Sequence, residues 1–311
     1  MLMMCLSALL PRTPQHQTPS AIRQAIAARH FLCANIHGRL GNQMFQYASV
    51  FGISRLKNMS MRVSRSDRVS RYFTISAQQF DGSNFCDYTN LKIEAQSCAF
   101  DPEMVDISSF INWKLINYLQ SWKYFYHVAD ELRKEFTFQQ PLKAIASRIF
   151  LNAVKDKRCF QRGATYVGVH VRRGDMATFA VRRNGTNVPL YNVAPRQYIL
   201  NAMQYYLQRY RCVVFVLVSD EMSWVRAQLG RHADLLNLVL VHTRHAALDM
   251  AILTLTNHTI MTTGTFGWWA AWLTGGTVTY YTHFVLDSSP LRPQFSKDFK
   301  DYYYPGWIPM E

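Results

Sequence analysis

The sequence lacks the marks of several large protein classes. No stretch reaches the roughly 20 consecutive apolar residues that span a bilayer, and the apolar run over residues 1–10 ends at Pro11. None of the six cysteines has the CxxC or Cys/His spacing of a zinc site. The sequence has neither a Walker loop nor a GxGxxG motif, so the usual sequence signals of ATP and NAD binding are absent. No DxD pair of the metal-dependent transferase kind is present.

Acidic residues are scarce as well. Twenty Asp and Glu stand against 34 Lys and Arg, which gives a net charge of +14. Such a chain attracts nucleotide phosphates, other polyanions or anionic membrane surfaces. The basic residues form short clusters, and no RRM, KH, zinc-finger or helix-turn-helix signature accompanies them. A solvated basic face explains most of these clusters, so no nucleic-acid partner is predicted and a non-enzymatic basic binding protein is kept only as an alternative.

Length and composition fit a globular protein of two domains. Of the 311 residues, 49% are hydrophobic and 17% are charged, which is not the composition of a disordered chain. Pro11, Pro14 and Pro19 mark residues 1–30 as a tail or a truncated anchor and stem. We expect two domains to follow, over residues 31–160 and 161–311.

The first predicted elements come directly after this tail. An apolar run at 31–36 precedes a Gly-containing turn at 38–42, and apolar residues then follow helical spacing from 44 to 53. This pattern predicts a strand, a turn and a helix. The aromatic-rich region 60–160 predicts little more than a partly helical segment over 119–138.

Strands and helices alternate clearly from residue 165 onward. Apolar or β-branched runs predict strands at 166–171, 213–218, 238–242, 259–262 and 278–281. Helices are predicted between them at 195–211, 220–229, 246–255 and 267–273. This alternation indicates a parallel sheet in a Rossmann-like domain. Ligands of such sheets bind beyond the carboxyl ends of the strands.

The first of these strands ends in the sequence HVRRGD, at 170–175. Because side chains alternate along a strand, His170 and Arg172 should share one face. The forked donors of Arg172 and Arg173 suit a diphosphate. Surface salt bridges are the ordinary explanation for such a pair, but its place at a strand end favours diphosphate binding.

Three further candidates follow neighbouring strands or begin helices. Ser219 either caps the next helix or faces the ligand. Asp249 either stabilises a helix dipole or accepts the protons of guanine. The turn at 262–267 opens a helix whose amides and hydroxyls suit an anion. Together with the arginines, that helix end would stabilise a departing diphosphate without a metal ion.

Three motifs in this order resemble the galactoside α-1,2-fucosyltransferases, glycosyltransferase family 11. GRLGNQMFQYA, within 31–54, resembles their opening motif, and VGVHVRRGDM at 167–176 resembles their nucleotide motif. ALDMAILTLTNHTIMTTGTFGWWAAWLTGG at 247–276 resembles their third. The HxRRxD pattern alone is shared with α-1,6- and protein O-fucosyltransferases, so a fucosyltransferase of another linkage is the second hypothesis.

The resemblance implies an α/β, GT-B-like fold, with two Rossmann-like domains whose parallel sheets face a cleft. It implies an inverting, metal-independent transfer of L-fucose from GDP-β-L-fucose to the 2-OH of a terminal β-galactose, with no cofactor. Residues 31–160 would form the acceptor side and residues 161–311 would bind the donor. A type II membrane protein of the Golgi lumen is implied too, with an incomplete anchor in this sequence.

The resemblance also assigns roles to individual residues. Arg172 and Arg173 would hold the diphosphate, and Asp175 would act as general base or orient an arginine. His170 and Asp249 would contact the guanosine. The loop 177–194 is expected to shape the choice of acceptor. The other implied residues are the phosphate contacts Gly264, Thr265 and Phe266 and the cleft residues of the other domain, Gly38, Arg39, Gly41, Asn42 and Gln43.

Overall fold

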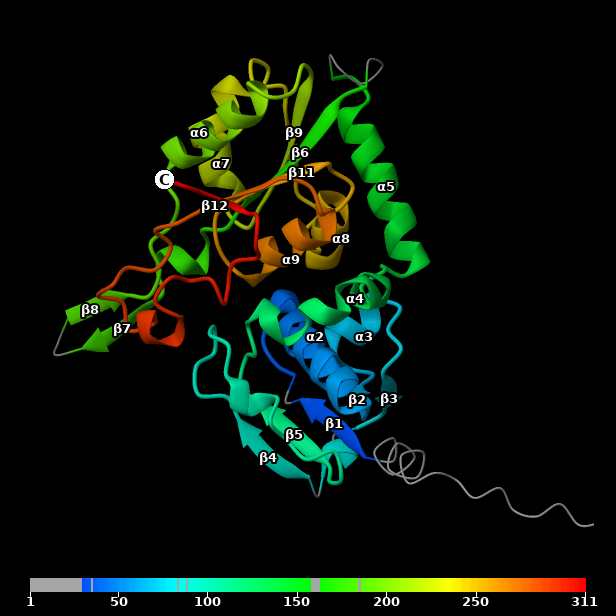
Figure 1. Ribbon diagram of the computed structural model, residues 1–311. Coiled ribbons are helices and arrows are strands. Elements are labelled where there is room, and N and C mark those ends of the chain that lie inside the picture. Colours follow the sequence, from blue (N-terminus) through cyan, green and yellow to red (C-terminus); the bar gives the residue numbers. More distant parts are fainter. Residues whose placement is uncertain (1–29, 35, 83, 88, 158–162, 184–185) are drawn as a thin grey trace, which may run out of the picture.

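The computed structural model describes residues 30–34, 36–82, 84–87, 89–157, 163–183 and 186–311. Two parallel sheets occupy the two halves of this chain, one above the other in Figure 1. The predicted tail at 1–30 lies outside the described residues apart from His30. The predicted domain boundary at 160/161 also falls outside them.

The first half holds a five-stranded sheet of order β3-β2-β1-β5-β4, in which every pair is parallel. The predicted strand and helix after the tail are confirmed, and the turn between them contains Gly38 at a φ of 82°. The predicted helical content of 119–138 is confirmed by short 3-10 turns followed by α4. The elements of this half are β1 (Phe31–Ala34), α2 (Leu40–Lys57), β2 (Ser60–Ser64), α3 (Arg68–Tyr72), β3 (Gln78–Phe80), β4 (Asn90–Ile93), β5 (Trp113–Ile116), α4 (Ala129–Glu135) and α5 (Gln140–Val154).

The second half holds a six-stranded parallel sheet of order β10-β9-β6-β11-β12-β13. Numbered along this half, the order is 3-2-1-4-5-6, which is that of the Rossmann fold. All five predicted strands are present, and a sixth, β13, completes the edge. The strands are β6 (Thr165–Val171), β9 (Val213–Ser219), β10 (Leu238–Val241), β11 (His258–Met261), β12 (Val278–Tyr281) and β13 (Ile308–Met310).

The four helices predicted for this half are present with shifted ends. The helix predicted to reach 211 ends at Leu207, and the one predicted from 267 already begins at Thr265. A two-stranded antiparallel hairpin projects from this half after β6 (Figure 1). The elements are β7 (Ala180–Arg183), β8 (Thr186–Pro189), α6 (Arg196–Leu207), α7 (Met222–Leu229), α8 (Ala246–Leu253) and α9 (Thr265–Thr274).

The two halves share one hydrophobic core. Helix α9 is apolar on every side, which is the pattern of a helix buried all round. Its Trp268 and Trp269 rings lie 4.6 and 5.1 Å from the ring of Phe45 on α2, measured between centroids. Figure 1 shows α2 and α9 at the junction between the two sheets. This contact fixes the N-terminal ends of both helices beside each other.

Candidate functional site

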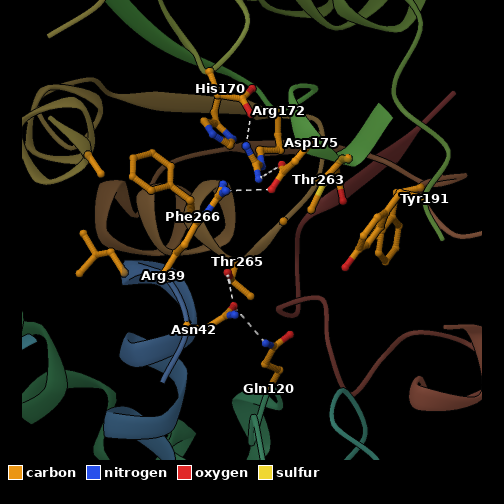
Figure 2. Close-up of a pocket in the computed structure, with 18 of the residues that line it drawn as sticks. Arg39, Asn42, Gln120, His170, Arg172, Asp175, Tyr191, Thr263, Thr265 and Phe266 are labelled. Carbon is orange, nitrogen blue, oxygen red and sulfur yellow. Dashed lines mark hydrogen bonds and ion pairs between the residues drawn. The ribbon is translucent and has the colours of Figure 1, made fainter. Parts of the chain in front are cut away.

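A cavity of about 850 Å³ lies at this junction and is lined by residues of both halves. It covers the carboxyl ends of the strands of the second sheet. The strand order of that sheet reverses between β6 and β11, and a ligand of a Rossmann sheet binds at such a switch point. Figure 2 shows the side chains that meet there.

Arg172 follows β6 directly at the switch point. Its backbone N–H donates to the hydroxyl of Thr262, just after β11, over 2.9 Å. Its guanidinium forms ion pairs with Asp175 and with Asp220, and only 13% of its side chain is exposed. Burial lowers the pKa of Arg172, whereas the Asp175 carboxylate opposes that shift. The Arg172 guanidinium is therefore held in a fixed orientation at the carboxyl end of β6, beside the switch point.

Arg173 does not accompany Arg172 into the cavity. Its guanidinium donates to the carbonyl of Ala194 over 3.0 Å and lies over the ring of Trp224, 4.1 Å from the centroid. Neighbouring side chains of an extended segment point in opposite directions. Of the two neighbouring arginines, Arg172 lines the cavity and Arg173 does not.

A second arginine reaches the site from the other half. Arg39, at the start of α2, forms an ion pair with Asp175 over 2.9 Å. The two oxygens of Asp175 are thereby engaged by two arginines, Oδ1 by Arg172 and Oδ2 by Arg39. Figure 2 shows the three side chains in contact. Asp175 joins the cationic groups of the two halves.

The N-terminal ends of α2 and α9 meet at the same point. The hydroxyl of Thr265 donates to Oδ1 of Asn42 over 2.7 Å, and Nε2 of Gln120 donates to the same oxygen over 3.3 Å. Gly264 precedes α9 at a φ of 87°, where a side chain would be strained. The amides of two helix N-termini lie here beside the guanidiniums of Arg39 and Arg172, whose charges Asp175 and Asp220 offset. Together these groups form a set of hydrogen-bond donors that suits an anion.

Gly41 explains how the two helices come so close. A Cβ atom at this position would lie 2.6 Å from the backbone nitrogen of Phe266 and 2.6 Å from the carbonyl carbon of Thr265. No side chain other than hydrogen fits there without a shift of the backbone.

His170 lies at the end of β6 and is almost fully buried, with 4% of its surface exposed. Its ring packs on that of Phe266, with centroids 5.0 Å apart, and borders the cavity. Burial, with a smaller effect of the Arg172 charge, lowers the pKa of His170 to about 3. The imidazole is therefore neutral at physiological pH and can donate or accept a hydrogen bond.

Asp249 lines the far end of the cavity from the first turn of α8. Its Oδ1 accepts hydrogen bonds from the N–H and the hydroxyl of Thr243, over 3.1 and 2.8 Å. Burial raises the pKa of Asp249, although these hydrogen bonds oppose the shift. Ser219 does not cap α7, whose N-cap is Glu221. Its hydroxyl accepts the N–H of Glu221 over 3.0 Å in the turn before the helix and borders the cavity.

Most of the sequence-predicted site residues lie around the cavity. Gln43 does not line it, because its side chain donates to the Gly38 carbonyl and accepts the N–H of Arg68. Several lining residues were not among the predicted site residues, and Asp220, Gln120 and Tyr191 are three of them. Asp220 had a sequence signal, since it follows a predicted strand end, and Tyr191 lies in the loop 177–194 that was expected to shape the choice of acceptor. The predicted residues that line the cavity are His170, Arg172, Asp175, Ser219, Asp249, Gly264, Thr265 and Phe266, with Gly38, Arg39, Gly41 and Asn42.

Two kinds of feature are absent from the described residues. In that part of the chain no three His, Cys, Asp or Glu side chains are grouped so that they would hold a metal ion. Likewise, none of the helices described above combines the length and the apolar character that crossing a bilayer needs.

Comparison with known sequences gives consistent matches. The sequence model of glycosyl transferase family 11 matches residues 5–311. Galactoside alpha-(1,2)-fucosyltransferase 2 of Sus scrofa is 32% identical over 283 residues, which is 89% of this chain and 79% of the relative. The Bos taurus protein of the same name is 31% identical, over 97% of this chain and 85% of the relative.

Solved structures resemble the fold at low sequence identity. A variant of Arabidopsis thaliana FUT1 in complex with GDP is 11% identical, with a TM-score of 0.53 over 85% of this chain and 75% of that chain. POFUT1 in complex with GDP-fucose is 10% identical, with a TM-score of 0.52 over 81% of this chain and 95% of that chain. The α/β, GT-B-like fold expected from the sequence is confirmed.

Proposed function

Because the chain belongs to glycosyl transferase family 11, we propose that it transfers L-fucose from GDP-β-L-fucose to the 2-OH of a terminal β-galactose. The relatives are named for this linkage and this acceptor. The proposal includes inversion at C1 of fucose and no requirement for a metal ion or a cofactor. One observation carries the donor assignment: Arg172 stands at the switch point, where the N-termini of α2 and α9 converge.

The donors at this end of the cavity fit the charge of the leaving group. The acceptor hydroxyl attacks C1, the bond from C1 to the phosphate oxygen breaks, and GDP departs with that electron pair while the hydroxyl releases its proton to solvent. Negative charge grows on the β-phosphate as the bond breaks. Fixed cations and helix amides stabilise such charge without reorganising during the reaction. We assign that role to Arg172, Arg39 and the first turn of α9.

Asp175 has a different part in this scheme. Both of its oxygens are already engaged by arginines, one from each half of the chain. We propose that it orients Arg39 and Arg172 toward the diphosphate. His170 and Asp249 stand where the guanosine would lie, and Asp249 Oδ1 is already occupied by Thr243. Its Oδ2 is the oxygen proposed to accept from guanine.

We further propose that the enzyme acts in the Golgi lumen. Cys33 and Cys86 form a disulfide between β1 and the segment that precedes β4. Disulfides persist in oxidising compartments such as the secretory pathway and are rare in the cytosol. The Cys33–Cys86 disulfide therefore supports a place in the secretory pathway, to which the Golgi lumen belongs.

Transfer assays test the activity directly. We expect labelled fucose to pass from GDP-fucose to β-galactosides, with an α-1,2 linkage by NMR of the product and the same rate in EDTA. Product with another linkage would favour the alternative fucosyltransferase classes, and loss of activity in EDTA would contradict metal independence.

Substitution of Arg172 tests the site. Arg172→Ala should lower kcat/KM for GDP-fucose by roughly 100- to 1000-fold, the usual loss for one transition-state donor. Arg148→Ala, on the exposed side of α5, should leave it within about twofold. Circular dichroism should show both variants folded. An unchanged kcat/KM in Arg172→Ala would remove the diphosphate role.

A further inference from the structure

The cavity has two ends of different chemistry. The end that borders β10, β9 and β6 is charged, with Arg172, Asp220 and Asp249 among its lining residues. The other end borders β11 and β12 and is closed by the first half of the chain. Its lining residues carry no formal charge: Ser97, Cys98, Tyr118, Gln120, Phe179, Tyr191, Phe284, Leu291, Phe295 and Tyr302.

The order of strands gives the donor a direction along the cavity. Asp249 follows β10 and Arg172 follows β6, with β9 between the two strands. A nucleotide with its base at Asp249 and its diphosphate at Arg172 therefore runs from β10 toward β11. Its sugar is carried past Thr263, into the uncharged end. The acceptor must meet the sugar there, because the charged end is filled by the nucleotide.

Phe179 and Tyr191 form the outer wall of the uncharged end. They stand at the base of the β7–β8 hairpin, one on each side of it, with ring centroids 6.5 Å apart and ring planes inclined at 62°. Phe179 is 48% exposed and lines the cavity, so it offers an apolar ring face to a ligand there.

The base of the hairpin is fixed to the end of β12. Nδ2 of Asn192 donates to the hydroxyl of Tyr281 and to the carbonyl of His283, over 3.1 and 2.8 Å. The hydroxyl of Ser289 donates to the Leu190 carbonyl over 2.8 Å. Because these bonds hold both sides of Tyr191 in place, its ring is pre-organised and costs little entropy on binding.

Two hydroxyl groups are available to a ligand at this end. Figure 2 shows the hydroxyl of Tyr191 directed into the cavity, and no hydrogen-bond partner for it is found among the described residues. Thr263 is 1% exposed and lines the cavity, and its hydroxyl likewise has no partner in that part of the chain. A buried polar group is normally paired, so the Thr263 hydroxyl points to a polar ligand. The hydroxyl of the half-buried Tyr191 offers such a ligand a second hydrogen-bonding group.

We propose that the uncharged end seats the terminal pyranose of the acceptor, with the apolar face of the ring on Phe179 and a sugar hydroxyl bonded to the hydroxyl of Tyr191. An aromatic wall with a few directed polar groups is the usual construction of a site for a neutral ligand. The seat rests on the proposed function and deepens it. It selects an uncharged terminal galactose and disfavours one that carries a carboxylate-bearing sugar.

Two substitutions with matched controls test the seat. Tyr191→Phe removes only the hydroxyl and should raise KM for a β-galactoside roughly 3- to 10-fold, the loss of one hydrogen bond. Phe179→Ala should raise the same KM at least as much. In both variants the affinity for GDP and the KM for GDP-fucose should stay within about twofold. Tyr210→Phe and Phe110→Ala make the same changes away from the cavity and should alter neither constant.

A binding measurement separates this inference from the proposed function. Saturation-transfer NMR of methyl β-galactoside with the GDP-bound protein should give signals that weaken in Tyr191→Phe and Phe179→Ala but persist in the controls. Binding without transfer by the wild type would overturn the proposed function and leave the seat standing. Equal signals in all variants, or a changed GDP affinity with an unchanged acceptor KM, would overturn the seat.

Discussion

Glu94, at the carboxyl end of β4, is an ionisable residue held in an apolar part of the first half. Only 2% of it is exposed. Its carboxyl accepts the N–H of Leu119 over 2.8 Å and the hydroxyl of Tyr124 over 3.0 Å. Burial outweighs these bonds and raises the pKa of Glu94 to about 8. The folded protein therefore keeps a proton there that the unfolded chain releases near pH 4.5.

This shift predicts how stability depends on pH. A group whose pKa is raised on folding makes its full contribution to the free energy of unfolding below the pKa that it has in the unfolded chain. That contribution is lost as pH rises through the pKa that it has in the folded protein. The Tm of the wild type should therefore fall between pH 6 and pH 9 by roughly 3–6 °C more than that of Glu94→Gln. Differential scanning fluorimetry measures this. Glu103→Gln, at an exposed carboxyl, should follow the wild type, and parallel curves for all three proteins would refute the assignment.

At the residue scale, sequence reasoning succeeded for side chains whose position follows from their own strand alone. His170 and Arg172 were placed on one face of β6 by alternation, and both line the cavity. The same rule separates Arg173 from Arg172, although both were expected at the diphosphate. Gln120 depends on elements that meet only after folding, and no local pattern announces such a partner. The catalytic roles of all these residues stay predictions.

The junction of α2 and α9 is the element on which the cavity is built. The approach of Gly41 to the backbone of Phe266 leaves no room for a methyl group. Gly41→Ala should therefore push the two helices apart, at a cost of about 1–3 kcal/mol for overpacking. It should also lower kcat/KM at least roughly tenfold, because the amides of α9 move relative to Arg172.

Gly230→Ala is the matched control for this change. Nothing lies within 4 Å of a Cβ atom built at Gly230. Chemical denaturation and steady-state kinetics should leave this variant close to the wild type. If both alanine variants lose equal stability, the tight contact at residue 41 is not the cause of the loss.

Elements were predicted well where strands are buried on both faces. Val213–Ser219 is fully buried, and its unbroken β-branched run predicted β9 to within one residue. The edge strands of the first half gave no such signal, because β3 and β4 are only 3 and 4 residues long and contain no buried residue. Strand β13 was missed because only its pairing with β12 makes Ile308–Met310 a strand. Tertiary pairing, not local preference, decides such segments.

At the scale of the whole molecule the shared core predicts a single unfolding unit. Phe45 is fully buried and contacts Trp268 and Trp269 of the other half. Phe45→Ala should cost about 3–5 kcal/mol and should lower one common transition. Hydrogen exchange followed by mass spectrometry should show protection lost together in β1 and β6. Phe110→Ala, at an exposed ring, is the control, and two separate transitions would contradict a common core.

The contact at Gly41 also limits how genes of this family could exchange parts. A crossover between the two sheets would join halves that had never been selected together. The half that contains α2 must have a glycine at position 41. The half that contains α9 must place the backbone of Thr265 and Phe266 against that glycine. A crossover near residue 160 is therefore constrained by the contact between Gly41 and Phe266. Each of these two residues lies more than 100 positions from the crossover. A library of shuffled halves would be enriched, after selection for solubility, in chimeras that keep both sides of that contact.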